Sequence, residues 1–196
     1  MPYYIVGLGN PGEQYEKTRH NTGRIVLEYC REKLSLSLWE FDKKIQARVS
    51  RGGIGKEKVL FIEPETFMNK SGISIRGLIA NKKKAEKLIV VHDDLDLPIG
   101  TFKISFNMGT AGHRGVESLI KVLKTRCFVR IRVGIAPTIS SGKTKKPHGK
   151  EKVINFILGN FTPSETKKIR IVSKKICEAI SVVVSQNRGV AMNMFN

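Results

Sequence analysis

Short β-branched and aromatic runs alternate with helical hydrophobic patterns along this chain, and this alternation limits its possible folds more than any other feature. The strand-like runs cover residues 3–8, 45–50, 58–63, 88–91, 101–106 and 128–135. Helical spacing of apolar residues covers 22–34, 71–82, 116–124 and the segment from 163 onward. Strands alternating with helices predict one α/β domain over residues 1–196, and the hairpin expected around the Gly-rich residues 51–55 makes its sheet mixed. The polar, basic residues 140–152 are expected to form a mobile loop.

The chain is strongly basic. Its 35 Lys and Arg residues outnumber its 17 Asp and Glu residues, which gives a formal net charge of +18. Such a charge favours a polyanionic partner, either nucleic acid or an anionic membrane surface. The basic residues gather at 82–84, at 143–146 and along the C-terminal helix, with few carboxylates among them. Solvated surfaces are the alternative interpretation of these segments. Contact with phosphates accounts better for their excess of positive over negative side chains.

Cysteine content and hydropathy indicate where the protein acts. Cys30, Cys127 and Cys177 are far apart and form no C-x-x-C pair, so we expect neither a disulfide framework nor a zinc ribbon. The first residues lack a basic stretch followed by an apolar one, and no apolar run approaches the ~18 residues of a membrane span. We therefore expect a cytoplasmic protein without a signal peptide or membrane segment.

A glycine-rich turn follows the first predicted strand. Residues 7–12 match the pattern G-x-G-x-x-G, which in dinucleotide-binding proteins leads directly into a helix. Here Pro11 and the polar residues 13–19 delay the helix, so nucleotide binding is disfavoured. The remaining interpretation is a tight loop at a strand end. A dinucleotide enzyme would need a helix that begins directly at Gly12.

Three histidines lie next to predicted sheet ends or Gly-rich turns. They are His20, His92 and His113, and Asp93 follows His92 directly. Each alone is typical of packing or capping, but ligands bind outside the carboxyl ends of strands in open α/β sheets, where these loops can meet. Among the motifs, H-E-x-x-H, paired Cys/His spacings and G-x-S-x-G are all absent, which disfavours a metal site or a serine hydrolase. A His–carboxylate pair near amide side chains is suited to water-mediated hydrolysis.

Taken together, the motifs of this chain resemble those of the bacterial peptidyl-tRNA hydrolases. The resemblance runs from Ile5 to about Phe161 and extends through the final helix. Any single match is weak, whereas their order and separations are highly specific. The matching segments are residues 7–12, Tyr15, 18–23, 64–72, 92–100, 112–115 and 130–135.

The resemblance implies a twisted mixed β-sheet flanked by helices, in a monomer that uses no metal and no cofactor. The implied reaction is hydrolysis of the ester between a nascent peptide and the 3′ ribose of tRNA, which recycles tRNA from prematurely released peptidyl-tRNA. By motif, His20 is the general base and Asp93 orients it. Asn10 and Asn69 hold the substrate, with Asn69 near the reacting carbonyl.

The resemblance also assigns binding roles. Tyr15 lines the cleft, Met68 forms an apolar wall, and Lys103 and Arg132 contact tRNA phosphates. His113 is expected at the cleft as well. The residue after it departs from the family pattern, because Arg114 stands where the family usually has Asn. Guanidinium carries charge and only donates hydrogen bonds, so we expect Arg114 to bind tRNA rather than position water.

An RNA-binding relative without catalytic activity is the alternative from another functional class. Plant organelles use proteins of this fold to assist intron splicing. The candidate catalytic residues His20, Asp93, Asn10 and Asn69 are all present in this chain, which argues against such a loss of activity.

Overall fold

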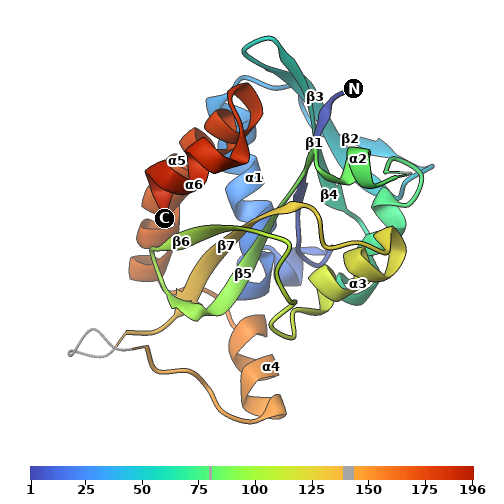
Figure 1. Ribbon diagram of the computed structural model, residues 1–196. Coiled ribbons are helices and arrows are strands. Elements are labelled where there is room, and N and C mark those ends of the chain that lie inside the picture. The colour runs from blue at the N-terminus through green and yellow to red at the C-terminus, as the bar shows by residue number, and fades with distance from the viewer. Residues whose placement is uncertain (80, 139–143) are drawn as a thin grey trace.

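The computed structural model describes residues 1–79, 81–138 and 144–196, in which seven strands form a single twisted sheet (Figure 1). The strands are β1 (Tyr3–Gly7), β2 (Glu40–Asp42), β3 (Ala47–Ile54), β4 (Glu57–Pro64), β5 (Leu88–Pro98), β6 (Phe102–Phe106) and β7 (Val129–Ala136). Their spatial order is β2-β3-β4-β1-β5-β7-β6. The central strands β4, β1, β5 and β7 are parallel, and the outer strands pair antiparallel. The predicted mixed sheet is confirmed.

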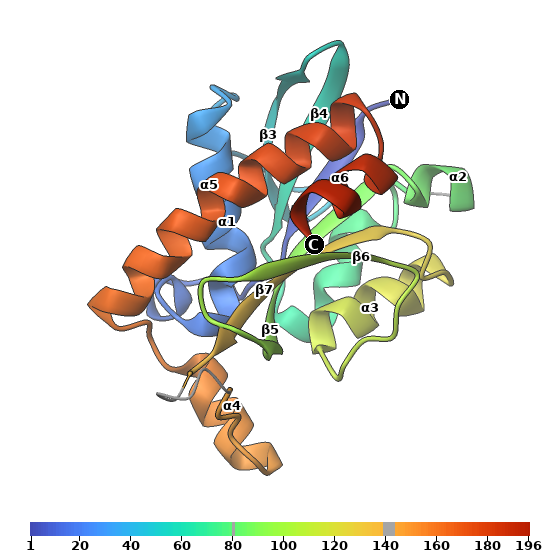
Figure 2. The same ribbon diagram turned by 60° about the vertical axis from the view of Figure 1, so that its left-hand side comes forward.

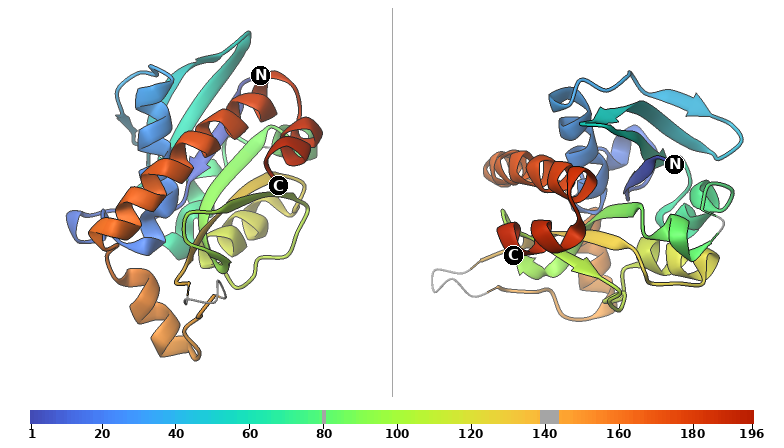
Figure 3. Two further views of the ribbon diagram at one scale, coloured as in Figure 1. Left: turned by 90° about the vertical axis from the view of Figure 1, so that its left-hand side faces the viewer. Right: turned by 45° about the horizontal axis from the view of Figure 1, so that its top comes forward.

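Helices cover both faces of this sheet. On one face lie α1 (Thr22–Lys33), α5 (Pro163–Ser185) and α6 (Arg188–Phe195), as Figure 2 shows. On the other lie the 3₁₀ helix η3 (Met68–Ile75), α2 (Lys82–Ala85) and α3 (Arg114–Leu123). Two short 3₁₀ helices, η1 (Glu13–Tyr15) and η2 (Arg19–Asn21), precede α1. The helix α4 (Lys150–Leu158) projects beyond one end of the sheet, where it contacts η2 (Figure 3).

The buried core has two halves because the sheet is covered on both faces. Ile5 of β1 packs with α1 and α5, whereas its neighbours Tyr4 and Val6 pack with η3 and α3. Successive side chains of a strand point to opposite faces, so a strand covered twice needs a continuous apolar run. This explains why β1 and the first half of β5 are recognisable in the sequence as uninterrupted hydrophobic segments.

The start of α1 is fixed by a close approach of backbones. A Cβ atom on Gly23 would lie 2.4 Å from the amide nitrogen of Leu8 and 2.4 Å from the carbonyl oxygen of Val91. Only glycine allows the first turn of α1 to rest this closely on the ends of β1 and β5. The segment just before α1, which contains His20, is thereby held at the carboxyl edge of the sheet.

Several predicted boundaries were wrong. β5 does not end at Val91 but continues through His92, Asp93 and Asp94, because these residues pair with β7 and are buried. The hairpin residues 51–54 belong to β3, which pairs with β4 as far as Ile54. The strand β2 and the helix α6 were not predicted.

Two helical predictions also need correction. The helix expected over 71–82 is replaced by η3, turns and the separate α2, with residue 80 outside the described part. The amide of Gly72 donates a hydrogen bond to Ser118 Oγ instead of continuing a helix. The loop expected over 140–152 ends earlier, because α4 begins at Lys150; residues 140–143 of that loop lie outside the described residues. None of the described helices is both long and apolar enough to cross a membrane.

Candidate active site

Three side chains from separate segments meet at the carboxyl edge of the sheet. His20 comes from η2, Asp93 from β5 and His113 from the residue just before α3. Nδ1 of His20 lies 3.0 Å from both carboxylate oxygens of Asp93, and Nε2 of His113 lies 3.0 Å from Oδ1 of Asp93. His20 and Asp93 are only 7% and 4% exposed, so their charges are poorly screened by solvent.

The hydrogen-bond pattern defines the proton on each ring. His113 caps α3, since its Nδ1 accepts from the amides of Gly115 and Val116 at 3.2 and 3.4 Å. Its proton in the neutral form is therefore on Nε2, which donates to Asp93. A carboxylate only accepts, so Nδ1 of His20 also donates to Asp93. The lone pair of His20 then resides on Nε2, the form that a general base requires.

The charge state of Asp93 fits this pattern. Burial raises the pKa of Asp93, but the facing His20 and His113 rings and their hydrogen bonds together hold the pKa well below its usual value. The carboxylate is thus ionised. The adjacent His92 has a pKa held well below its usual value by burial and by the neighbouring His113. Its neutral ring donates through Nδ1 to the carbonyl of Asp93 at 2.8 Å, and its buried Nε2 has no partner in the described structure.

Amide side chains form another wall of the site. Oδ1 of Asn10 accepts a hydrogen bond from the amide of Met68 at 2.9 Å. The Nδ2 group of Asn10 is then the part of this side chain that can donate to a substrate. Asn21 holds the Asn10 backbone from both sides, with its Oδ1 accepting from the Asn10 amide at 2.8 Å and its Nδ2 donating to the Asn10 carbonyl at 3.0 Å. Asn69 is exposed and lines the cavity. Sequence reasoning gave Asn21 no role, although it lies in the same motif as His20.

His20, Asp93, His113, Asn10 and Asn69 line a cavity of about 570 Å³. Its polar end contains His20, Asp93 and His113, and its apolar walls come from two sides. One side includes Tyr15, Phe67 and Met68, with the Tyr15 and Phe67 rings in an edge-on contact at 6.5 Å between centroids. The other side is the inner face of α4, formed by Val153, Ile154, Ile157 and Leu158. Phe67 and the α4 residues were missed, although the apolar spacing within 153–158 is a helical signal.

A residue of the His20 motif anchors α4 over the cavity. The Arg19 guanidinium stacks on the Phe156 ring at 4.4 Å from the ring centre and forms an ion pair of 2.8 Å with Glu165 of α5. Thr18 forms a β-bridge with Asn160, just after α4. The segment 18–23 therefore positions both the candidate base and the wall opposite it.

Eight of the ten predicted site residues line this cavity, and two do not. Those that line it are Asn10, Tyr15, His20, Met68, Asn69, Asp93, His113 and Arg114. Lys103 and Arg132 are cross-strand neighbours on β6 and β7, outside the cavity lining. Arg132 is connected to it, since its Nε donates to Oδ2 of the cavity residue Asp94 at 2.6 Å.

A metal ion is the other ligand that these side chains could hold. His20, Asp93 and His113 offer ligand atoms that all lie within 4.8 Å of one another. The same atoms are already joined by hydrogen bonds of 3.0 Å, so the cluster is also internally satisfied as a proton-bearing network. Both uses draw on the same nitrogen atoms, so they compete with each other.

An ionised Asp–His pair at the end of an apolar cleft, on an α/β sheet, is an arrangement typical of a hydrolase. The sequence profile of the peptidyl-tRNA hydrolases matches residues 4–196. The chain is 38% identical over 193 residues to a peptidyl-tRNA hydrolase of Aquifex aeolicus, covering 98% of this chain and 95% of the relative. It is 40% identical over 198 residues to that of Herpetosiphon aurantiacus, covering 99% and 90%.

Solved structures agree. The crystal structure of peptidyl-tRNA hydrolase from Acinetobacter baumannii superposes with a TM-score of 0.88 at 28% identity, covering all of this chain and 94% of the other. This chain belongs to the peptidyl-tRNA hydrolase family. The predicted class, a carboxylic ester hydrolase, is confirmed, and the alternative of an inactive RNA-binding relative is not supported.

Proposed function

We propose that this protein hydrolyses the ester between a peptide and the 3′ ribose of tRNA, with His20 as general base and without a metal or cofactor. The observation that carries this proposal is the hydrogen bonding around Asp93, which leaves the lone pair of His20 on Nε2. Hydrolysis of an ester at neutral pH needs an activated water, and a neutral imidazole is suited to accept its proton.

The reaction follows from the positions of the side chains. A water molecule hydrogen-bonded to Nε2 of His20 attacks the carbonyl carbon, and its proton moves to that nitrogen. Asp93 stabilises the resulting imidazolium. The oxygen that becomes negative accepts hydrogen bonds from the amide of Asn69, with Asn10 holding the adjoining part of the substrate. When the intermediate collapses, the C–O bond to the ribose breaks and His20 returns the proton to the 3′ oxygen.

Binding is assigned to the surroundings of the cavity. We propose that Tyr15 and Met68 contact the substrate next to the ester, that His113 and Arg114 also line its path, and that Lys103 and Arg132 contact tRNA phosphates. The net charge of +18 supports recognition through the backbone, which all tRNAs share. We further propose that the chain acts in the cytoplasm, as a monomer with one domain over residues 1–196.

The test is release of an N-acetylated aminoacyl group from tRNA by the purified protein, compared with a His20→Ala variant. Loss of the base should lower turnover by a factor of ~10² or more while tRNA affinity stays similar. His148→Ala is the matched control, because this histidine is exposed and lies outside the cavity lining. Turnover of His20→Ala at the wild-type level would refute the role of His20.

A chelator tests the second part of the proposal. Exhaustive treatment with EDTA should leave turnover unchanged, since the proposed water activation needs only His20 and Asp93. Loss of activity that Zn²⁺ or another divalent ion restores would instead assign the cluster of His20, Asp93 and His113 to a metal.

A further inference from the structure

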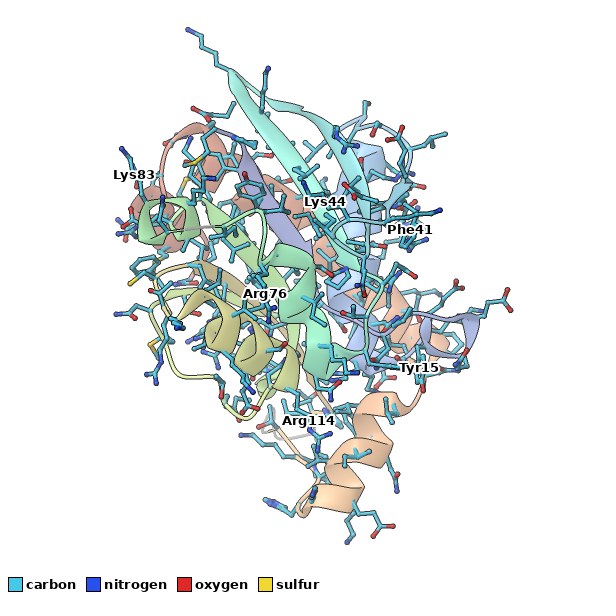
Figure 4. The ribbon with its side chains drawn as sticks, turned by 90° about the vertical axis from the view of Figure 1, so that its right-hand side faces the viewer. Tyr15, Phe41, Lys44, Arg76, Lys83 and Arg114 are labelled. Atoms are coloured by element: carbon cyan, nitrogen blue, oxygen red, sulfur yellow. The ribbon has the colours of Figure 1, made fainter. Side chains whose placement is uncertain are left out.

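A second cavity joins the first at Asn69 and Arg114, which line both. It has a volume of about 430 Å³ and lies between η3 and α3. We call it the cationic groove, because its charged lining residues are Lys70, Arg76, Arg114, Lys121 and Glu117. Four positive charges therefore face one negative charge. Arg76 and Arg114 are labelled in Figure 4, on the side of the molecule that also presents Tyr15.

The positive charges of the groove are not neutralised by ion pairs. None of its four basic side chains forms an ion pair with any residue in the described part of the chain, whereas Arg19, Arg24 and Arg132 each pair with a carboxylate. Glu117 accepts a hydrogen bond of 3.3 Å from Thr110. Unpaired cations that surround a concave surface raise the local concentration of anionic groups.

The groove and the proposed tRNA contacts adjoin the main cavity through different residues. Arg132 is bonded to Asp94, which lines the main cavity at the end of β5, while Arg114 and Asn69 line it where the groove begins. In Figure 1, β6 and β7 lie on the left of the molecule and α3 on the right. Lys168, in the N-terminal part of the basic helix α5, lies near Gly100 in the turn before β6.

A substrate with its ester at His20 has its tRNA on one side and its peptide on the other. With the tRNA over β6, β7 and α5, the peptide leaves toward the groove. Asn69 is assigned to the reacting carbonyl and also lines the groove, so the groove begins within about one residue of the ester. An extended peptide advances ~3.3–3.6 Å per residue, so the next few residues lie within it.

We propose that the cationic groove binds the peptide part of the substrate and favours acidic side chains in the second to fourth residues from the ester. This inference rests on the proposed function. It also revises the role of Arg114, which the sequence alone assigned to tRNA, because Arg114 lies at the junction between the ester and the groove. Its guanidinium is suited to bidentate contact with a carboxylate.

The experiment compares N-acetylated tetrapeptides esterified to the same tRNA, with either Glu or Lys at the second to fourth positions. Exposed ion pairs contribute little each, so we expect a kcat/KM for the Glu substrate roughly three- to tenfold above that for the Lys substrate at low salt. The double variant Arg76→Glu/Lys121→Glu should invert this ratio. High salt should bring the ratio of the wild type close to one, because these charges are exposed to screening.

The matched control is Lys56→Glu/Lys58→Glu, which changes the net charge equally at the exposed end of the β3–β4 hairpin. Its Glu-to-Lys ratio should equal that of the wild type. A groove that binds RNA instead would make Arg76→Glu/Lys121→Glu lower kcat/KM equally for both peptides, and that result would overturn the proposal. So would equal kcat/KM values for both peptides with the wild type. Absence of hydrolysis of every substrate would instead refute the proposed function itself.

Discussion

Replacement of Asp93 by Asn keeps the proposed base His20 and removes the carboxylate that orients it. The carboxylate accepts from Nδ1 of His20 and from Nε2 of His113. The proton of His113 is fixed, because its other nitrogen caps α3. The side-chain oxygen of an Asn must therefore stay at the Oδ1 position, and its NH₂ group takes the place of Oδ2.

The new amide leaves His20 with two options. Nδ1 of His20 lies 3.0 Å from both positions, so it can still donate to the oxygen that it shares with His113. It can also accept from the new NH₂ group, which moves its proton to Nε2 and removes the base. Only part of the population keeps the correct tautomer, and the imidazolium loses its counter-charge in all of it.

The magnitude follows from the lost charge. Two unit charges about 4 Å apart attract by about 4 kcal/mol at an effective dielectric constant of about 20, which corresponds to about 10³-fold in rate. This sets the upper limit for Asp93→Asn, and sharing of Oδ1 reduces the loss. We expect turnover to fall by roughly 10- to 10³-fold, less than for His20→Ala.

The assay is single-turnover release of the acyl group from a saturating ester substrate. Asp94→Asn is the matched control, because Asp94 is the next residue and equally buried but bonds to Arg132 rather than to a histidine. Its turnover should stay near that of the wild type. Full activity of Asp93→Asn together with an inactive Asp94→Asn would refute the reasoning, because the supporting carboxylate would then be the wrong one.

Three further outcomes are expected. Affinity for tRNA should fall steeply with salt, and Arg132→Glu should reduce the log–log slope by about 1 and raise KM; an unchanged slope would remove Arg132 from the phosphate contacts. The pKa of His92 is lowered in the native state, so below pH ~6.5 the unfolded chain binds a proton that the native chain does not bind. The urea midpoint should therefore fall as the pH drops below ~6.5, and His92→Gln should weaken this pH dependence. Gly23→Ala should destabilise the fold by about 1–3 kcal/mol or more in urea unfolding, since its Cβ would meet backbone atoms at 2.4 Å; an unchanged midpoint would contradict this contact.

The sequence predicted those parts of the fold in which burial on both faces requires an apolar composition. Strand β1 and the first half of β5 are apolar because helices cover both faces of the sheet there, and β7 alternates because only its Val129, Ile131 and Val133 face joins the apolar core. The second half of β5 could not be predicted, because His92, Asp93 and Asp94 have no strand pattern of their own. They are held in the strand by pairing with β7, which is a tertiary effect.

The candidate site was likewise predicted only in part. Motif positions predicted eight residues of the cavity, and the structure places them together. Their hydrogen bonds could not be predicted, because no pattern states that His113 caps α3 through one nitrogen and faces Asp93 through the other. The wall formed by α4 was missed for a related reason. That helix is short, has no fully buried residue, and depends on Arg19, which is distant in sequence.

Two glycines explain how separate elements bring the histidines to one carboxylate. Gly23 lets the first turn of α1 pack on the ends of β1 and β5, and this packing fixes the position of His20 at the edge of the sheet. Gly115 lets the first turn of α3 pack closely on η3 and on the residue after β1, since a Cβ there would lie 2.5 Å from the sulfur of Met68 and 2.9 Å from Leu8. Each imidazole is therefore positioned by an adjoining helix whose first turn is closely packed, α1 on the ends of β1 and β5 and α3 on η3. A shift of either helix by a methyl radius would lengthen hydrogen bonds that are now 3.0 Å and would reduce turnover before it unfolds the chain.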